Sequence, residues 1–390
     1  MFSIFYLHLS PDVNALKMGI PILIFLVSFF VVFVCTPSLI KVSIMKNLTD
    51  EPGDLRKVHS KHIPTLGGVI IFAGTLFSLT LLLPTIAASG SAASDVVVSD
   101  ANYLLAALLI IFFIGIKDDI VGTAAIFKLL GHILVGMILV LMGNIRITGF
   151  HGLFGIHEIP YWASAFLSVF TYVVVVNAFN FIDGLDGLAT GIGFISAMCF
   201  GLFFTLSGSP ALAGIAFALA GSLLGFLIYN FAPAKIFMGD SGSLFTGLIL
   251  CTLGIKLIEF DTSQVPSYLV TVSRPLLVMG LFAYPLMDML RIVIIRTLKG
   301  VSPLAADRNH IHHALIDLKL GHGKSSGSLY LYTLSVIALV YAVRGMNTTV
   351  SFLLVGGFAI MTLQIPIFLR YRQRRSKTAI VKEMERHHAN

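Results

Sequence analysis

The sequence of 390 residues is far more apolar than that of a water-soluble domain. Hydrophobic residues make up 57% of it, charged residues only 12%, and the mean hydropathy is +0.93. Because soluble domains carry roughly 25% charged residues, this composition excludes an ordinary soluble protein and indicates a polytopic membrane protein. The net charge of +7 fits membrane topology and attraction to anionic lipid headgroups, and we expect no nucleic-acid partner.

Apolar stretches of about 20 residues can cross about 30 Å of hydrocarbon as helices, and we expect about eleven of them in an all-α fold. In chain order they cover residues 18–44, 66–84, 102–116, 126–142, 162–179, 188–206, 211–229, 243–257, 275–295, 328–344 and 349–369. We expect a single integral-membrane domain over residues 1–370, followed by a basic cytoplasmic tail over 371–390. Cys35, Cys199 and Cys251 fall within the apolar stretches, which argues against a disulfide framework and a cysteine-based metal site.

The lysines and arginines are divided unequally between alternate connections. With the flanking helix ends included, 21 of the 26 fall on one side of the predicted topology. Cytoplasmic connections retain positive charge, so this side is predicted to face the cytoplasm, with the N-terminus outside and the C-terminus inside. The same side carries every connection that holds a candidate site motif. We therefore expect one site, open to the cytoplasm.

Asp118 and Asp119 end the third apolar stretch, in the segment FIGIKDDIVG. Adjacent carboxylates repel each other, and at a helix C-terminus they also face the negative end of the helix dipole. A positive partner is therefore expected, which could be a divalent cation, Lys117 or Lys128. A solvated pair in a loop is the alternative.

Two further acidic motifs follow. In NAFNFIDGLDGLATG, Asn180, Asp183 and Asp186 are spaced by three, so a helical turn would direct all three side chains to one side. In FMGDSGSLFTG, Asp240 stands before the eighth stretch, where a helix start beside a glycine-rich turn favours phosphate. Either motif could instead be a simple turn or helix cap.

A histidine cluster, SPLAADRNHIHH, contains Arg308, His310, His312 and His313. Histidines beside an arginine suit phosphate through charge-assisted hydrogen bonds. A structural zinc site is less favoured without a nearby cysteine or an HExxH pattern, and an interfacial basic loop is a further alternative. Combined with the acidic motifs, this inventory predicts a magnesium-dependent phosphate site.

With RKVHSKHIPTLGG at Arg56–Gly68, these motifs form an ordered series of five between about Asp50 and His313. The series resembles the polyprenyl-phosphate N-acetylhexosamine-1-phosphate transferases, and most closely the bacterial branch that uses undecaprenyl phosphate and UDP-GlcNAc. The resemblance implies transfer of GlcNAc-1-phosphate to undecaprenyl phosphate in the inner leaflet of the bacterial cytoplasmic membrane, with release of UMP, at the start of cell-envelope glycan assembly. It also implies Mg²⁺, or Mn²⁺ in its place.

The resemblance further implies roles for individual residues. The catalytic group comprises Asp118, Asp119, Asp183, Asp186 and His312. The substrate-binding group comprises Lys61, Lys128, Asn180, Arg308, His310 and His313. The metal ligands are Asp240 and Asp119. By contrast, the spacing of Asp288 and Arg291 on one face of the ninth stretch favours a structural ion pair.

Several alternatives stay open from the sequence. Within the same family, the donor could carry phospho-MurNAc-pentapeptide, or another UDP-N-acetylhexosamine. A one-step displacement competes with a two-step route through an aspartyl-phosphate. An intramembrane aspartyl protease and a membrane transporter are the readings from other classes, and the one-sided charge cluster without an internal repeat disfavours the transporter. The oligomeric state, including a homodimer, is undetermined.

Overall fold

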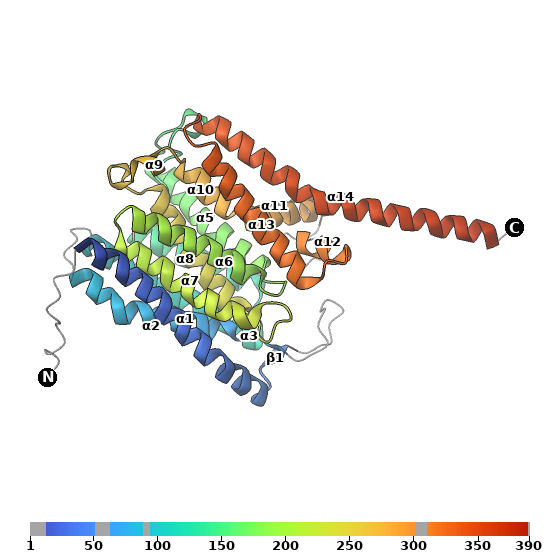
Figure 1. Cartoon of the computed structure of the whole chain (residues 1–390), viewed down its shortest axis with the longest axis horizontal. Helices are drawn as coiled ribbons and strands as arrows, with labels where there is room; N and C mark the ends of the chain where they lie inside the picture. Colours follow the sequence, from blue (N-terminus) through green and yellow to red (C-terminus); the bar gives the residue numbers. More distant parts are fainter. Residues whose placement is uncertain (1–12, 51–62, 89–93, 301–309, 389–390) are drawn as a thin grey trace.

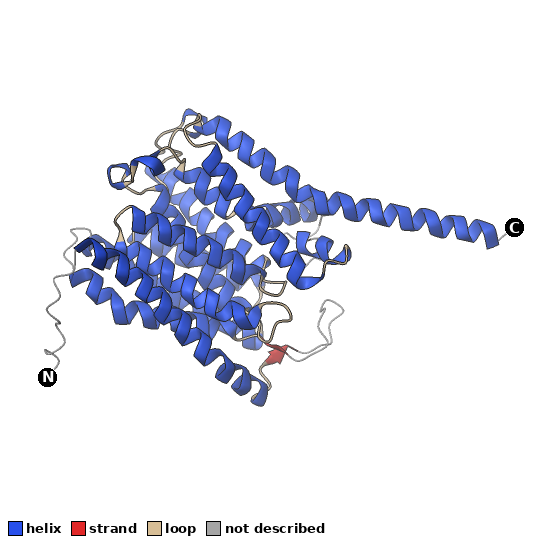
Figure 2. Cartoon of the chain, in the orientation of Figure 1, coloured by secondary structure: helices blue, strands red, loops and turns tan. Residues whose placement is uncertain are grey.

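The computed structural model shows a bundle of long helices, with one helix projecting from it (Figures 1 and 2). The structure describes residues 13–50, 63–88, 94–300 and 310–388. The long helices are α1 (Val13–Met45), α2 (Gly67–Ala88), α3 (Ser94–Val121), α4 (Ala125–Met137), α5 (Tyr161–Phe181), α6 (Leu188–Leu206), α7 (Pro210–Asn230), α8 (Gly239–Ile258), α11 (Ala283–Leu298), α13 (Gly321–Ala342) and α14 (Thr348–His388).

Short elements complete the described chain. The helical ones are η1 (Ile138–Met142), which continues α4, then η2 (Leu153–Gly155), η3 (Thr262–Gln264), α9 (Ser267–Val270), α10 (Arg274–Leu281) and α12 (Ile311–Asp317). Strands β1 (Thr49–Asp50) and β2 (Ile63–Pro64) pair antiparallel, with Thr49 opposite Pro64. Each expected apolar stretch corresponds to a helix, to α4 with η1, or to the pair α10 and α11.

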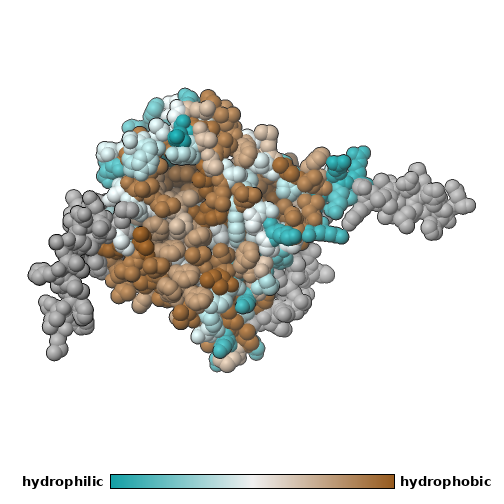
Figure 3. Space-filling model, in the orientation of Figure 1, coloured by the Kyte–Doolittle hydropathy of each residue, from teal (hydrophilic) through white to brown (hydrophobic). Residues whose placement is uncertain are grey.

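The all-α polytopic membrane fold is therefore confirmed. Among the described residues, eight helices are long and apolar enough to cross a membrane, or nine if α10 and α11 form one broken span. Figure 3 shows hydrophobic side chains over the middle of the bundle and hydrophilic ones gathered toward its ends. Such a surface suits a lipid environment, because lipid tails are as apolar as the side chains and exposure to them carries no free-energy penalty. The count of eleven spans stays a prediction.

Helix α8 forms the centre of the bundle and is almost completely enclosed. It contacts α2, α3, α5, α6, α7 and α10. Glycines allow the close approach of its first turn to its neighbours, because a Cβ on Gly115 of α3 would lie 2.4 Å from the Cα of Ser241, and one on Gly68 of α2 would lie 2.1 Å from the amide nitrogen of Gly242. The start of α8 is thus held tightly between α2 and α3.

The structure differs from the sequence expectation in three places. The ninth stretch is bent by 67° between α10 and α11. Helix α8 begins at Gly239, so Asp240 lies in its first turn and not in the preceding connection. Helix α14 runs without interruption through the predicted boundary at residue 370, and at 41 residues it is about 60 Å long. Its last part projects beyond the bundle (Figure 1).

Candidate active site

The acidic motifs meet where α8 begins. Asp118 and Asp119 lie in the last turns of α3, and Asp240 lies in the first turn of α8. Helices α4 and α5 bring Lys128 and Asn180 to the same place. Residues separated by more than 100 positions in the sequence therefore share one polar cluster at one end of the bundle.

Asp119 anchors the start of α8. Its Oδ1 accepts a hydrogen bond from the amide of Asp240 at 2.7 Å, and its Oδ2 accepts from the amide and the hydroxyl of Ser241 at 3.1 and 2.6 Å. The two amides are among the N–H groups that a helix start leaves without partners, and the hydroxyl adds a side-chain donor. Three of the approximately four lone-pair positions of this carboxylate are thus used. Asp119 primarily fixes the backbone beneath Asp240.

Lys128 supplies the positive charge that the aspartate pair requires. Its Nζ lies 2.9 Å from Oδ2 of Asp118 and also donates a short hydrogen bond to Oδ2 of Asp240. One ammonium group therefore bridges carboxylates from α3 and α8. All three side chains are only partly buried, so the cluster remains accessible to a charged substrate.

Asn180 and Asp183 complete the cluster from the end of α5. The Nδ2 of Asn180 donates to Oδ1 of Asp240 at 2.9 Å and to Oγ of Ser243 at 3.0 Å. The Asp183 carboxylate accepts a hydrogen bond from the amide of Gly239. Burial, followed by the charges of Asp240 and Asp119, raises the pKa of Asp183 well above its usual value. The carboxyl group of Asp183 is therefore harder to ionise than that of an ordinary aspartate while Asp240 and Asp119 lie beside it.

Asp186 has different partners from Asp183. Its Oδ2 accepts a hydrogen bond from the amide of Ala234 at 3.0 Å, and its Oδ1 lies 3.2 Å from Nδ1 of His322 on α13. The predicted common direction of Asp183 and Asp186 depended on a continuous helical turn. However, α5 ends at Phe181, and residues 182–187 form turns. Asp186 ties this loop to the neighbouring segments.

The histidine cluster packs against the same loop. The rings of His310 and His312 are stacked with their centroids 5.2 Å apart, and the ring of His313 lies 4.4 Å from that of His312. The Nε2 of His312 faces Gly184, since a Cβ there would lie 3.2 Å from it. Burial lowers the pKa of His312 to about 3, so this imidazole is neutral at physiological pH.

Two predicted substrate-binding residues, Lys61 and Arg308, lie outside the described residues. The chain just after Lys61 does reach the cluster. The amide of Gly67 donates to the carbonyl of Phe237 at 3.0 Å, and that of Gly68 donates to the carbonyl of Met238 at 2.8 Å. The end of the RKVHSKHIPTLGG motif therefore supports the turn that leads into Asp240.

Three participants were not assigned a site role from the sequence. Ser241 binds Asp119, His322 contacts Asp186, and Asp288 of α11 contacts His310 at 2.7 Å. The position of Ser241 directly after Asp240 could have predicted a hydrogen-bonding role, because serine at a helix start commonly binds backbone or side-chain groups. The contacts of His322 and Asp288 join distant segments, and spacing along the chain gives no sign of them. In place of a pairing with Arg291, the described contacts of Asp288 are with His310 and Ile311.

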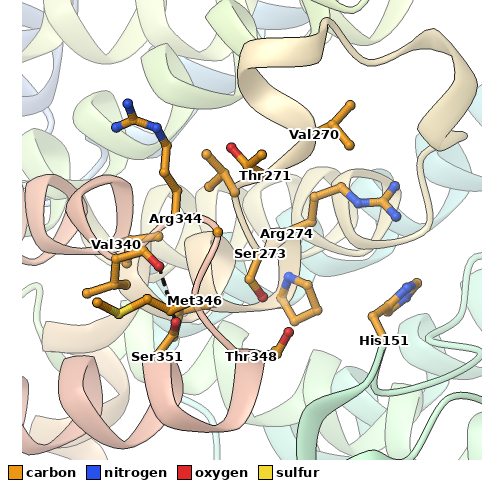
Figure 4. Close-up of a pocket in the computed structure, with 15 residues that line it drawn as sticks. His151, Val270, Thr271, Ser273, Arg274, Val340, Arg344, Met346, Thr348 and Ser351 are labelled. Carbon is orange, nitrogen blue, oxygen red and sulfur yellow. Dashed lines mark hydrogen bonds between the residues drawn. The ribbon is translucent and has the colours of Figure 1, made fainter.

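A separate cavity of about 190 Å³ lies near η2, α9 and the turn between α13 and α14 (Figure 4). Arg274 and Arg344 line it, but their guanidinium groups point in different directions (Figure 4). Arg274 donates to the carbonyl of Phe260, and Nε2 of His151 lies 3.3 Å from Oε1 of Glu259. These basic groups already have partners, so the acidic cluster is the better candidate for phosphate chemistry.

The acidic cluster fits a divalent metal ion by the chemistry of its donors. Carboxylates of Asp118 and Asp240 both contact the Lys128 ammonium, and the carboxyl group of Asp183 lies beside Asp240 as a further oxygen donor. Magnesium typically takes one or two protein carboxylates and completes its shell with phosphate oxygens and water. Asp240 and Asp118 are better placed as ligands than Asp119, whose lone pairs are mostly occupied by the start of α8.

Comparison with known proteins adds an independent line of support. Residues 101–258 match the family model described as glycosyl transferase family 4. A probable undecaprenyl-phosphate N-acetylglucosaminyl 1-phosphate transferase of Bacillus subtilis is 31% identical, over 85% of this chain and 88% of its own.

An undecaprenyl-phosphate alpha-N-acetylglucosaminyl 1-phosphate transferase of Escherichia coli is 30% identical over 71% of each chain. A decaprenyl-phosphate N-acetylglucosaminephosphotransferase of Mycobacterium leprae is 34% identical over 71% of this chain and 72% of its own. The matched region includes Asp118, Asp119, Asp183 and Asp240. This multi-pass membrane protein is a phosphoglycosyltransferase that belongs to glycosyl transferase family 4.

Proposed function

We propose that the protein transfers GlcNAc-1-phosphate from UDP-GlcNAc to undecaprenyl phosphate, giving undecaprenyl-diphosphate-GlcNAc and UMP. The observation that carries the proposal is the convergence of Asp118 and Asp240 on Lys128 at the start of α8. The names of the relatives supply the sugar and the lipid: they are N-acetylglucosamine phosphate transferases that act on undecaprenyl or decaprenyl phosphate.

In this proposal Asp240 and Asp118 hold Mg²⁺, or Mn²⁺ in its place, and Asp119 keeps the start of α8 in position. The bound ion would neutralise negative charge on the diphosphate during transfer. Lys128 binds phosphate oxygens, and Asn180 fixes the orientation of Asp240. His312 is neutral and buried, and its imidazole offers a hydrogen bond to UDP-GlcNAc without adding charge.

The proposed chemistry is a direct displacement. An oxygen of the lipid phosphate attacks the β-phosphorus of UDP-GlcNAc, the bond from that phosphorus to the oxygen bridging the α- and β-phosphates breaks, and UMP leaves with that oxygen. The partly exposed carboxylates and ammonium act chiefly by positioning and charge. An aspartyl-phosphate intermediate is the competing route, and trapping a phosphorylated enzyme would contradict direct displacement.

The site is proposed to face the cytoplasm of a bacterial inner membrane. The distribution of lysine and arginine favours this orientation. UDP-GlcNAc would then enter from the cytoplasm, while the lipid phosphate would lie at the headgroup level of the inner leaflet.

The experiment supplies purified protein in detergent or nanodiscs with sugar-labelled UDP-GlcNAc, undecaprenyl phosphate and magnesium. The expected result is equimolar formation of UMP and labelled lipid, both abolished by EDTA and restored by excess magnesium. Parallel reactions contain UDP-MurNAc-pentapeptide or UDP-GalNAc. Exclusive turnover of UDP-MurNAc-pentapeptide would overturn the proposed donor, and no UMP release with any donor would overturn the proposed reaction.

A further inference from the structure

Asp288 places a carboxylate beneath the histidine cluster. Its side chain is fully buried on α11. Oδ2 lies 2.7 Å from Nδ1 of His310, and Oδ1 accepts a hydrogen bond from the amide of Ile311 at 2.8 Å. A buried charge is strongly unfavourable unless it is paired and hydrogen-bonded. Here a single carboxylate holds both the ring of His310 and the first amide of α12.

The distances among Asp288, His310 and His312 identify a hydrogen-bonded pair and not a metal site. Ligand atoms of Asp288, His310 and His312 all lie within 4.8 Å of one another, which by itself would suit a metal ion. Tetrahedral zinc, with bonds of about 2.0 to 2.2 Å, keeps neighbouring ligand atoms roughly 3.3 Å apart. The 2.7 Å between Asp288 and His310 is a hydrogen-bond distance, and the Ile311 amide occupies the other oxygen.

This contact decides which nitrogen of His310 faces outward from the pair. An ionised carboxylate can only accept hydrogen bonds, so Nδ1 of His310 carries the hydrogen that points to Asp288. Nε2 is then the atom left for a ligand. The same arrangement of carboxylate and imidazole sets the tautomer and orientation of histidines that act on substrates or metals.

The rings of His310 and His312 stack, so the orientation of one limits that of the other. The Nδ1 of His312 is buried and has no hydrogen-bond partner among the residues that the structure describes. Its ring is held by stacking on His310 and by contact with Gly184, the residue after Asp183. The ring of Phe181, two residues before Asp183, also contacts His310, with centroids 6.1 Å apart. Asp288 is thus connected to the loop that carries Asp183 through the stacked rings of His310 and His312.

We propose that Asp288 is a positioning residue of the transferase, which fixes the tautomer and orientation of His310 and thereby docks the histidine cluster beside the Asp183 loop. The inference rests on the proposed function, since its readout is transfer from UDP-GlcNAc. Asp288 itself does not contact the substrate. Its effect on catalysis passes through His310.

The test is a double-mutant cycle with Asp288→Asn, His310→Gln and the variant carrying both. We expect Asp288→Asn to lower kcat/KM for UDP-GlcNAc about 10- to 100-fold, the range typical of residues that orient a functional histidine. The double variant should be no less active than His310→Gln, because Asp288 has nothing to position once the imidazole is removed. Losses that multiply would overturn the proposal, as would wild-type activity in Asp288→Asn.

Asp317→Asn is the matched control. Asp317 ends α12, the helix whose first amide donates to Asp288, and it is exposed, with its Oδ2 2.7 Å from Nη2 of Arg370. Loss of this carboxylate should leave kcat/KM within about twofold of wild type, since exposed ion pairs contribute little. A loss equal to that of Asp288→Asn would show a general effect of removing charge near α12 and overturn the specific role.

Two further measurements cover folding and metal. If Asp288→Asn fails to accumulate in the membrane, Asp288→Glu, which keeps the charge, should recover activity, and an equally inactive glutamate variant would contradict positioning. Wild-type protein stripped with a chelator should regain full activity with magnesium alone. A requirement for added zinc would instead establish a metal site at Asp288. Absence of turnover by the wild type is a failure of the proposed function and is distinct from these outcomes.

Discussion

At the scale of single residues, Lys128 and Asp119 show two different uses of charge in one cluster. Lys128 bridges Asp118 and Asp240, while Asp119 is committed to backbone amides. The family resemblance gave both aspartates a catalytic role and also placed Asp119 among the metal ligands. Their side chains leave α3 in different directions, so only the assembled structure separates the carboxylate that faces the ammonium from the one that supports α8.

Replacing Lys128 with glutamine is expected to lower kcat/KM about 100-fold. The ammonium offsets the carboxylates of the free site, and it provides a positive group to the phosphates of the substrate. UMP release by purified variants measures the effect. Lys235→Gln, which removes an exposed lysine at the same end of the bundle, is the control and should retain activity. Equal activity in the two variants would remove Lys128 from the site.

Asp118→Asn and Asp119→Asn should be distinguishable by stability. Both are expected to lose activity, but Asp119→Asn would also place an amide NH₂ against the amides or hydroxyl at the start of α8. Losing these hydrogen bonds should cost about 1 to 3 kcal/mol, which lowers the thermal unfolding midpoint. Asp118→Asn should unfold near the wild-type temperature. A reversed order of midpoints would contradict the anchoring role of Asp119.

At the scale of elements, the start of α8 depends on Gly239. This residue has φ +71°, and a Cβ on it would lie 2.2 Å from the carbonyl oxygen of Thr65 and 2.8 Å from both carboxylate oxygens of Asp119. The glycine therefore provides both an unusual backbone conformation and the space for close packing. Asp240 can enter the cluster only because the preceding residue has no side chain.

Gly239→Ala is accordingly expected to reduce activity at least about tenfold, since a shift near 1 Å at reacting groups has large kinetic effects. Gly345→Ala is a matched control: its φ is +81°, yet a Cβ there meets nothing within 4 Å. It should share the conformational cost of about 1 to 2 kcal/mol without the loss of activity. Kinetics and thermal unfolding of both variants provide the comparison. Similar activities would show that crowding at Asp119 is unimportant.

Much of the fold could be predicted because hydrophobicity fixes helices in a membrane. Every expected stretch corresponds to helical structure. Hydropathy did not predict the break between α10 and α11 or the continuation of α14 past residue 370. A bend, or an extension beyond the bilayer, changes the hydropathy of the sequence very little.

For the site, the sequence placed the motifs of Asp118, Asp183 and Asp240 on one face of the membrane, and these three side chains lie close together in the structure. The partners of Asp186 and Asp288 depend on tertiary packing and stayed hidden. A turn after Phe181 separates Asp183 from Asp186, and spacing alone assumed a helix there.

At the scale of the whole molecule, the orientation in the membrane is open to a direct test. We expect a cysteine at residue 263 to face outward and one at residue 375 to face the cytoplasm. Ser263→Cys and Arg375→Cys, in a protein lacking Cys35, Cys199 and Cys251, would be treated with a membrane-impermeant maleimide. Intact spheroplasts should label only the first, and permeabilised ones should label both. The opposite pattern would place the active site outside.

The bridge from Lys128 also has a consequence for the resting enzyme. Because an ammonium group already stands between Asp118 and Asp240, their mutual repulsion is relieved by the polypeptide itself. If Asp118 and Asp240 hold a divalent ion as proposed, Lys128 would give up these contacts when the ion binds, and its ammonium group would then be available to the diphosphate. Chelation should therefore abolish turnover while the thermal unfolding midpoint stays within a few degrees of its starting value. Adding magnesium back should restore the activity.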